Sequence, residues 1–148
     1  MYQPRKVIIP VKLKENDKDV LSQLRQMEFL SGSEVHLVHV FETTTYTKYF
    51  TDFPQIYPVT PDSKMVQESI NVFLSNLAQE ILPLSFQGKV ITKCLFDEPK
   101  SGFSHYVEAE KPDLVVIPTR QKRGMFESSF AQYVAKHTQA NLFLLKGA

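Results

Sequence analysis

The chain has few cysteines, few glycines and almost no net charge. Cys94 is the single cysteine among 148 residues, which excludes an intrachain disulfide and a Cys-rich metal site and favours a reducing cytoplasm. The charged residues nearly cancel, at a formal net charge of +1, so no bulk attraction draws the protein to nucleic acid or to an anionic membrane. We therefore expect no nucleic-acid and no membrane partner, and any preference for anions has to come from a local cluster of charges.

Long hydrophobic runs are also missing. The apolar run that follows Lys6 is five residues long, too short for the core of a signal peptide, and no stretch approaches the roughly 20 residues of a membrane span. A P-loop, a His-Glu-x-x-His motif and a Gly-x-Ser-x-Gly elbow are absent from the sequence. The sequence thus predicts a soluble, cytoplasmic protein folded as one domain over residues 1–148.

Apolar, β-branched runs alternate along the chain with segments of helical periodicity. Strands are expected at residues 7–11, 35–41, 89–95, 113–118 and 141–146. Helices are expected at about 17–30 and 63–81, between 97 and 111, and from about 128 to 137. The second of these helices carries one apolar stripe: Val66, Ile70, Phe73, Leu74, Leu77 and Ile81. This βαβαβαβαβ order predicts an α/β fold with an open five-stranded parallel sheet.

A basic segment, residues 119–124, follows the fourth expected strand and leads to Ser128 and Ser129 at a helix start. Ligands of open α/β sheets bind beyond the carboxyl ends of the strands, and free amides at a helix start attract anions. Lys12 and Lys14 follow the first strand and would face this segment across the sheet. The pattern indicates an anion site. The alternative reading is a solvated surface loop in which the two serines only cap the helix.

Four segments together resemble the universal stress protein family over nearly the whole chain. They are Lys6-Val-Ile-Ile-Pro-Val11, Glu34-Val-His-Leu-Val-His-Val40, Pro112-Asp-Leu-Val-Val-Ile-Pro-Thr-Arg120 and Val134-Ala-Lys-His-Thr-Gln-Ala-Asn-Leu-Phe-Leu-Leu145. The resemblance implies strand order 3-2-1-4-5 with helices on both faces, a homodimer and, in many members, ATP bound between strands 1 and 4.

The chain departs from the glycine pattern of the family's ATP-binding members. Pro118 and Gln121 stand where the first two glycines belong, the loop to Ser128 is three residues short, and Lys12 replaces an Asp that helps to hold the nucleoside. The altered site would be lined by Pro10, Lys12, Val40, Pro118, Arg120, Gly124, Ser128 and Ser129. Lost backbone hydrogen bonds to phosphate outweigh the contribution of exposed lysines, so no cofactor is certain and ATP is expected to bind weakly, with a dissociation constant of about 0.1 mM or poorer. A small anion is the other expected ligand.

Two further segments predict contacts between subunits or over the site. Leu142, Phe143, Leu144 and Leu145 make the last strand apolar on both faces at a sheet edge, and universal stress proteins pair this strand across a two-fold axis. Residues 42–61 form a long connection rich in aromatics (Tyr46, Tyr49, Phe50, Phe53, Tyr57). This connection could form a lid or an interface, or it could pack on its own domain.

The remaining candidates for chemistry favour structural roles. His36 and His39 point to opposite faces of a strand and cannot share a metal ion. His137 suits the end of its helix, and Ser101-Gly-Phe-Ser-His105 has no identifiable acid partner. We therefore expect a dimeric binding or regulatory module of the stress response, with weak or no ATP binding and no catalysis. The alternative is an ATP-binding universal stress protein with slow ATP hydrolysis, and an unrelated enzyme on the same fold comes third.

Overall fold

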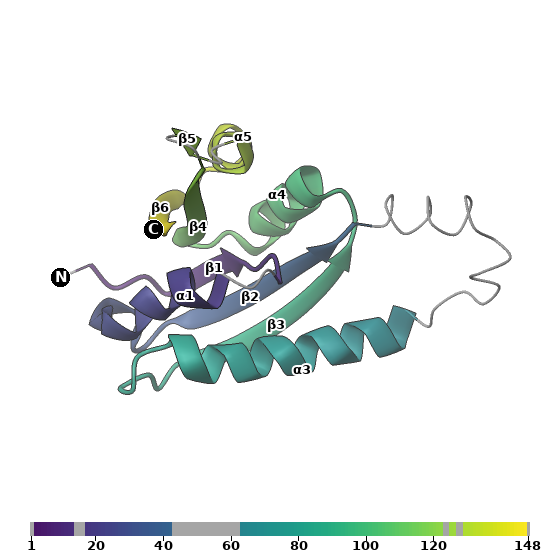
Figure 1. Cartoon of the computed structure of the whole chain (residues 1–148). Helices are drawn as coiled ribbons and strands as arrows, with labels where there is room; N and C mark the ends of the chain where they lie inside the picture. The colour runs from purple at the N-terminus through teal and green to yellow at the C-terminus, as the bar shows by residue number, and fades with distance from the viewer. Residues whose placement is uncertain (1, 14–16, 43–62, 123–124, 127–128, 148) are drawn as a thin grey trace, which may run out of the picture.

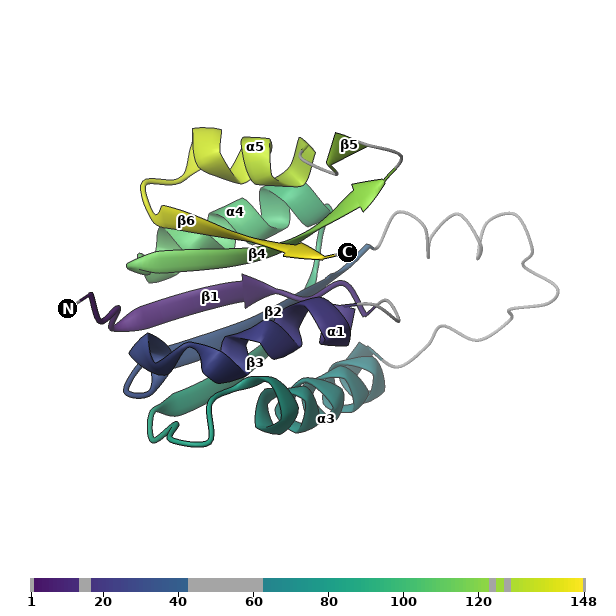
Figure 2. The same cartoon turned by 60° about the vertical axis from the view of Figure 1, so that its left-hand side comes forward.

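The computed structural model describes residues 2–13, 17–42, 63–122, 125–126 and 129–147. Five parallel strands form its sheet: β1 (Lys6–Pro10), β2 (Glu34–Phe41), β3 (Lys89–Phe96), β4 (Leu114–Lys122) and β6 (Asn141–Gly147). They lie in the order β3-β2-β1-β4-β6, which confirms the expected 3-2-1-4-5 order (Figure 2). Of the helices in the described ranges, none combines the length and the apolar character needed to span a membrane.

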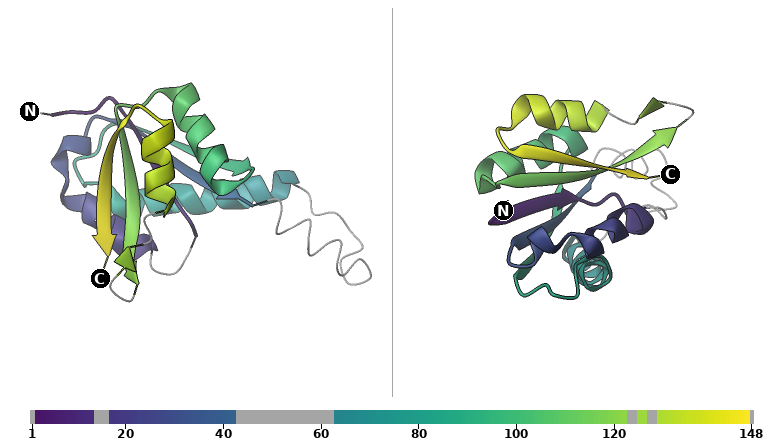
Figure 3. Two further views of the ribbon diagram at one scale, coloured as in Figure 1. Left: turned by 90° about the horizontal axis from the view of Figure 1, so that it is seen from above. Right: turned by 90° about the vertical axis from the view of Figure 1, so that its left-hand side faces the viewer.

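Helices cover both faces of the sheet, as expected (Figures 1 and 3). Helix α1 (Asp17–Leu21) and helix α3 (Ser63–Ile81) pack on one face, and helices α4 (Pro99–Glu110) and α5 (Ser129–His137) pack on the other. Successive residues along a strand point to opposite faces of the sheet and so belong to different core clusters. Val7 and Ile9 belong to the first core cluster, whereas Ile8 belongs to the second, in which Phe103 of α4 is fully buried. Apolar residues on both faces explain why the strands read as continuous apolar runs.

The first expected helix is wrong beyond Leu21. The chain continues as two 3₁₀ segments, η1 (Ser22–Gln26) and η2 (Glu28–Leu30), which meet at Met27. Leu21, Leu24, Met27 and Leu30 recur every three residues, which matches the 3.0 residues per turn of a 3₁₀ helix better than the 3.6 of an α-helix. This spacing keeps Leu21, Leu24 and Leu30 buried.

Two other expectations need correction. Phe73 of the expected apolar stripe is 50% exposed, while Ile70, Leu74, Leu77 and Ile81 are buried. The segment read as a basic loop from residue 119 is strand as far as Lys122, because Thr119 and Arg120 pair with Lys146 and Gly147 of β6. The last two residues of β4, Gln121 and Lys122, pair with a short antiparallel strand, β5 (Met125–Phe126). The aromatic connection at 42–61 lies outside the described residues apart from Glu42.

Candidate functional site

The connection after β1 leads to β2 on one side of the sheet, and the connection after β4 leads to β6 on the other side. Strands β1 and β4 therefore separate beyond their short pairing. They are paired at Val7–Leu114 and Ile8–Val115, whereas β1 stays paired with β2 to Pro10 and β4 stays paired with β6 to Arg120. In open α/β sheets this topological switch point is where ligands bind, outside the carboxyl ends of the strands. We call the group of residues at the carboxyl ends of β1 and β4 the switch-point site.

Four of the expected residues lie near these strand ends or at the start of the helix after β4. Pro10 is buried at the end of β1, Pro118 is half-buried in β4, and Ser129 is the first residue of α5. Val40 is half-buried in β2, and its backbone lies beyond the pairing with β1, which ends at Val38. Because proline has no N–H, Pro10 and Pro118 offer no backbone donor to an anion.

The remaining expected residues are placed only in part. Arg120 lies in β4 with its backbone opposite Gly147, rather than in a loop. Gly124 and Ser128 lie outside the described residues, so their predicted contacts with a ligand stay predictions.

Lys12 joins the two sides of the switch-point site. Its backbone N–H donates to Asp17 Oδ2 at 2.8 Å, and its ammonium lies 5.4 Å from the centre of the Phe130 ring on α5. This distance is within the range of a cation–π contact. The Lys12 amide is therefore hydrogen-bonded to Asp17, while the ammonium extends from the segment after β1 to the helix that follows β4.

His39 is a member of this site that the sequence did not single out. It follows Val38 in β2, and its Nδ1 lies 2.8 Å from the Val11 carbonyl oxygen. A carbonyl only accepts, so Nδ1 carries the hydrogen and the neutral ring keeps a lone pair on Nε2. Desolvation lowers the pKa of His39, although the Val11 hydrogen bond and the charge of Asp17 oppose the shift. The signal in the sequence is its position near the carboxyl end of the second strand.

His36 points to the other face of the sheet, as predicted, and is the buried member of a partly buried polar network. Its Nε2 lies 2.9 Å from Glu34 Oε2, and its Nδ1 lies 2.6 Å from the Tyr106 hydroxyl of α4. The carboxylate accepts from Nε2–H, so in the neutral ring Nδ1 accepts from the tyrosine. Lys6 completes the network with contacts to Glu34 at 3.8 Å and to Glu110 at 3.1 Å.

This Glu-His-Tyr arrangement has the order of a nucleophile triad but not its chemistry. Burial, followed by the charges of Glu110 and Glu34, raises the pKa of Tyr106 well above the usual range. His36 is itself only 2% exposed. A tyrosine that resists deprotonation is a weak nucleophile, so the network stabilises the packing of α4 on β2.

The other candidates for chemistry are buried. Ser104 is 2% exposed, and its hydroxyl has no hydrogen-bond partner among the described residues. Burial raises the pKa of the Cys94 thiol, as suits a packing residue. Within the described part of the chain, no three His, Cys, Asp or Glu side chains gather closely enough to hold a metal ion.

The comparison with protein families gives one assignment over almost the whole chain. Residues 3–146 match the model of the Universal stress protein family. No curated protein sequence matches the chain significantly.

Solved structures of low sequence identity share the fold. Universal stress protein UspA from Lactobacillus plantarum superposes with a TM-score of 0.65 at 12% identity, over 98% of this chain and 99% of that one. An Arabidopsis thaliana family member with AMP bound gives a TM-score of 0.60 at 15% identity, over 98% and 93%. The Archaeoglobus fulgidus universal stress protein in complex with dAMP gives 0.54 at 18% identity, over 98% of both chains. The order of the sheet, these superpositions and the family match over residues 3–146 agree: the chain belongs to the universal stress protein family.

Proposed function

We propose that the protein is a cytoplasmic, dimeric binding or regulatory module of the stress response that takes small anions at the switch-point site and binds ATP only weakly. The observation that carries the proposal is the position of Lys12, which stands where the family pattern has an Asp and holds its ammonium over Phe130. A cation there favours phosphate or sulfate over the hydroxyl groups of a ribose.

The backbone around Lys12 explains why ATP should bind weakly. The Lys12 N–H already donates to Asp17, and Pro10 and Pro118 have no N–H to give. Each missing hydrogen bond to a charged phosphate is worth about 1.5 to 3 kcal/mol, whereas an exposed ammonium contributes about 1 kcal/mol or less. Nucleotides bound to solved relatives, AMP in the plant protein and dAMP in the archaeal one, support a residual affinity.

Calorimetric titration with inorganic phosphate and with magnesium and ATP tests the proposal. We expect phosphate binding that Lys12→Ala weakens about fivefold, and ATP binding no tighter than about 0.1 mM. Lys89→Ala is the matched control, because Lys89 is exposed at the amino end of β3. Micromolar ATP affinity would favour the ATP-dependent alternative, and equal phosphate affinity in Lys12→Ala would contradict the role of Lys12.

We also propose that the module has no catalytic turnover. The support is chemical: the pKa of Tyr106 is raised and the Ser104 hydroxyl has no base within hydrogen-bond distance among the described residues. Phosphate release from ATP over hours, measured against a heat-inactivated sample, is the test. Release that follows protein concentration and survives further purification would establish the slowly hydrolysing alternative.

The partner is proposed to be a second copy joined through β6. Phe143 and Leu144 are 37% and 46% exposed on this edge strand, whereas Leu145 is buried. An apolar edge pairs well with its own copy across a two-fold axis. Light scattering should show a dimer that Leu144→Lys weakens, while Val72→Lys, which puts the same charge on the 62% exposed Val72 of α3, leaves it intact. A monomer at micromolar concentration would contradict this interface.

A further inference from the structure

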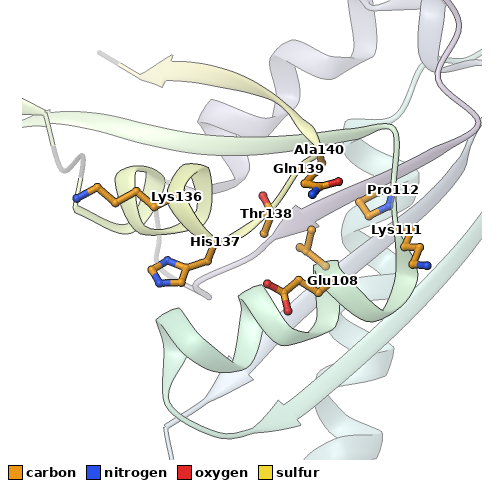
Figure 4. Close-up of a pocket in the computed structure, with 9 residues that line it drawn as sticks. Glu108, Lys111, Pro112, Lys136, His137, Thr138, Gln139 and Ala140 are labelled. Atoms are coloured by element: carbon orange, nitrogen blue, oxygen red, sulfur yellow. The ribbon is translucent and has the colours of Figure 1, made fainter.

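A pocket lies near the amino ends of the strands, whereas the switch-point site lies near their carboxyl ends. It sits between the carboxyl ends of α4 and α5, near the amino ends of β4 and β6 (Figure 4). Its volume is about 630 Å³, within the usual range of small-molecule sites. Polar side chains line it from both helices: Glu108 from α4, His137 from α5, and Thr138 and Gln139 directly after α5.

The His137 ring is held so that it presents an acceptor. Its Nδ1 lies 2.8 Å from the Tyr133 carbonyl oxygen, and the ring stacks on Tyr133 with centroids 4.0 Å apart and planes 18° apart. The carbonyl accepts, so Nδ1 carries the hydrogen and the neutral ring offers the Nε2 lone pair. The Glu108 carboxylate also only accepts. Thr138 has used its hydroxyl hydrogen on the Val134 carbonyl at 2.8 Å, which leaves lone pairs.

The backbone adds negative potential to these acceptors. Both α4 and α5 end at the pocket, and a helix carries a partial negative charge of roughly half a unit at its carboxyl end. At α4 the Lys6 ammonium already donates to the Glu110 carbonyl at 3.0 Å, so the larger contribution comes from α5. Lys111 and Lys136 line the pocket, but Figure 4 shows their side chains directed away from Glu108 and His137. The acceptors of Glu108 and His137 therefore favour a donor-rich cation over an anion at this place, although Lys111 and Lys136 line the same pocket.

The wall of the pocket is apolar. Val107 is 1% exposed, Pro112 is buried and Ala140 is half-buried. We propose that this pocket binds a small primary amine, with the ammonium between the Glu108 carboxylate and His137 Nε2 and a short hydrocarbon chain against Val107, Pro112 and Ala140. The same ammonium could belong to a free diamine or to a zwitterionic amino acid, in which case Lys111 or Lys136 at the rim would meet the carboxylate.

The test uses putrescine as the probe for a free diamine and L-leucine for a zwitterion. Each is titrated into the full chain at pH 8 by calorimetry and by amide chemical shifts. We expect at least one of them to bind, with shift changes at Thr138 and Ala140, and Glu108→Gln to weaken it about fivefold or more. His137→Gln should weaken it as well. Glu68→Gln is the matched control, because Glu68 is an exposed carboxylate on α3 and its replacement changes the net charge equally.

The outcomes separate the sources and the alternatives. Binding of putrescine alone identifies a free amine, and binding of L-leucine alone identifies an amino acid; both support the proposal. It is overturned if neither binds up to about 10 mM, if Glu108→Gln binds as tightly as the unaltered chain, or if sodium acetate binds while both amines do not. If neither amine binds, the switch-point proposal still stands, because phosphate and ATP are expected to bind at the carboxyl ends of the strands, away from this pocket.

Discussion

Replacing Tyr106 by Phe removes one hydroxyl from the His36 network and should lower the free energy of unfolding by more than the loss of a solvent-exposed hydroxyl would. The hydroxyl lies 2.6 Å from His36 Nδ1, and the His36 side chain is 2% exposed. Without it, a buried ring nitrogen loses its partner and stays shielded from water. Such an orphaned group costs about 1 to 3 kcal/mol, which corresponds to a fall in the melting temperature of about 3 to 9 °C for a chain of this size.

Urea unfolding and calorimetry at pH 7 measure the effect, and Tyr133→Phe supplies the control. Tyr133 is a half-buried tyrosine on α5, and losing its hydroxyl should change stability by about 0.5 kcal/mol or less. The double variant Tyr106→Phe, His36→Leu sharpens the test, because it removes both partners together. Its cost should fall short of the sum of the two single variants by about 1 kcal/mol or more. Additive effects, or a Tyr106→Phe variant as stable as Tyr133→Phe, would refute the reasoning.

Three further outcomes follow from packing and charge. Phe103→Ala empties the centre of the second core cluster, where Phe103 is fully buried, and should lower the free energy of unfolding by about 3 to 5 kcal/mol in urea titrations. Gly88→Ala should cost about 1 to 3 kcal/mol, because a Cβ at Gly88 would overlap the backbone carbonyl of Ser33; an unchanged urea midpoint would contradict this. The hydrogen bonds from the Lys6 and Arg5 amides lower the pKa of Asp113. Its stabilisation is therefore complete above the unfolded value near 4 and is lost as pH falls through the lowered folded value, so Asp113→Asn should be less stable than the unaltered chain at pH 7 and equal to it in strong acid.

The strands were predictable because burial on both faces leaves a local signal in the sequence, a continuous apolar run such as residues 114–117. The first helix was not, because three-residue and four-residue spacings look alike over 14 residues, and the choice between them depends on packing against α3. The end of β4 was hidden for a similar reason. Arg120 and Lys122 resemble loop residues, and only pairing with β6 and β5 holds them extended.

The positions of the candidate site residues were predictable from the sequence, but their contacts were not. Fold topology locates the carboxyl ends of β1 and β4, and Lys12, Pro118 and Ser129 indeed lie there. The contact of Lys12 with Phe130 depends on side-chain direction across two elements. The pocket between α4 and α5 is lined by residues about 30 positions apart in the chain, so no local sequence pattern predicts it.

Because β1 and β4 are paired over only a short length, the sheet consists of two parts, β3-β2-β1 and β4-β6, and we call the boundary between β1 and β4 the seam. The amino end of this seam is fastened, because Asp113 accepts the amides of Arg5 and Lys6 at 2.7 and 3.0 Å and donates its own to the Lys6 carbonyl at 3.0 Å. At the carboxyl end, the Lys12 ammonium lies 5.4 Å from the centre of the Phe130 ring and so links the segment after β1 to the helix after β4. A ligand bound there would contact both parts of the sheet, so its binding should slow amide hydrogen exchange along the whole seam. The molecule could thus report an occupied site through the stiffness of its sheet, without any change of shape.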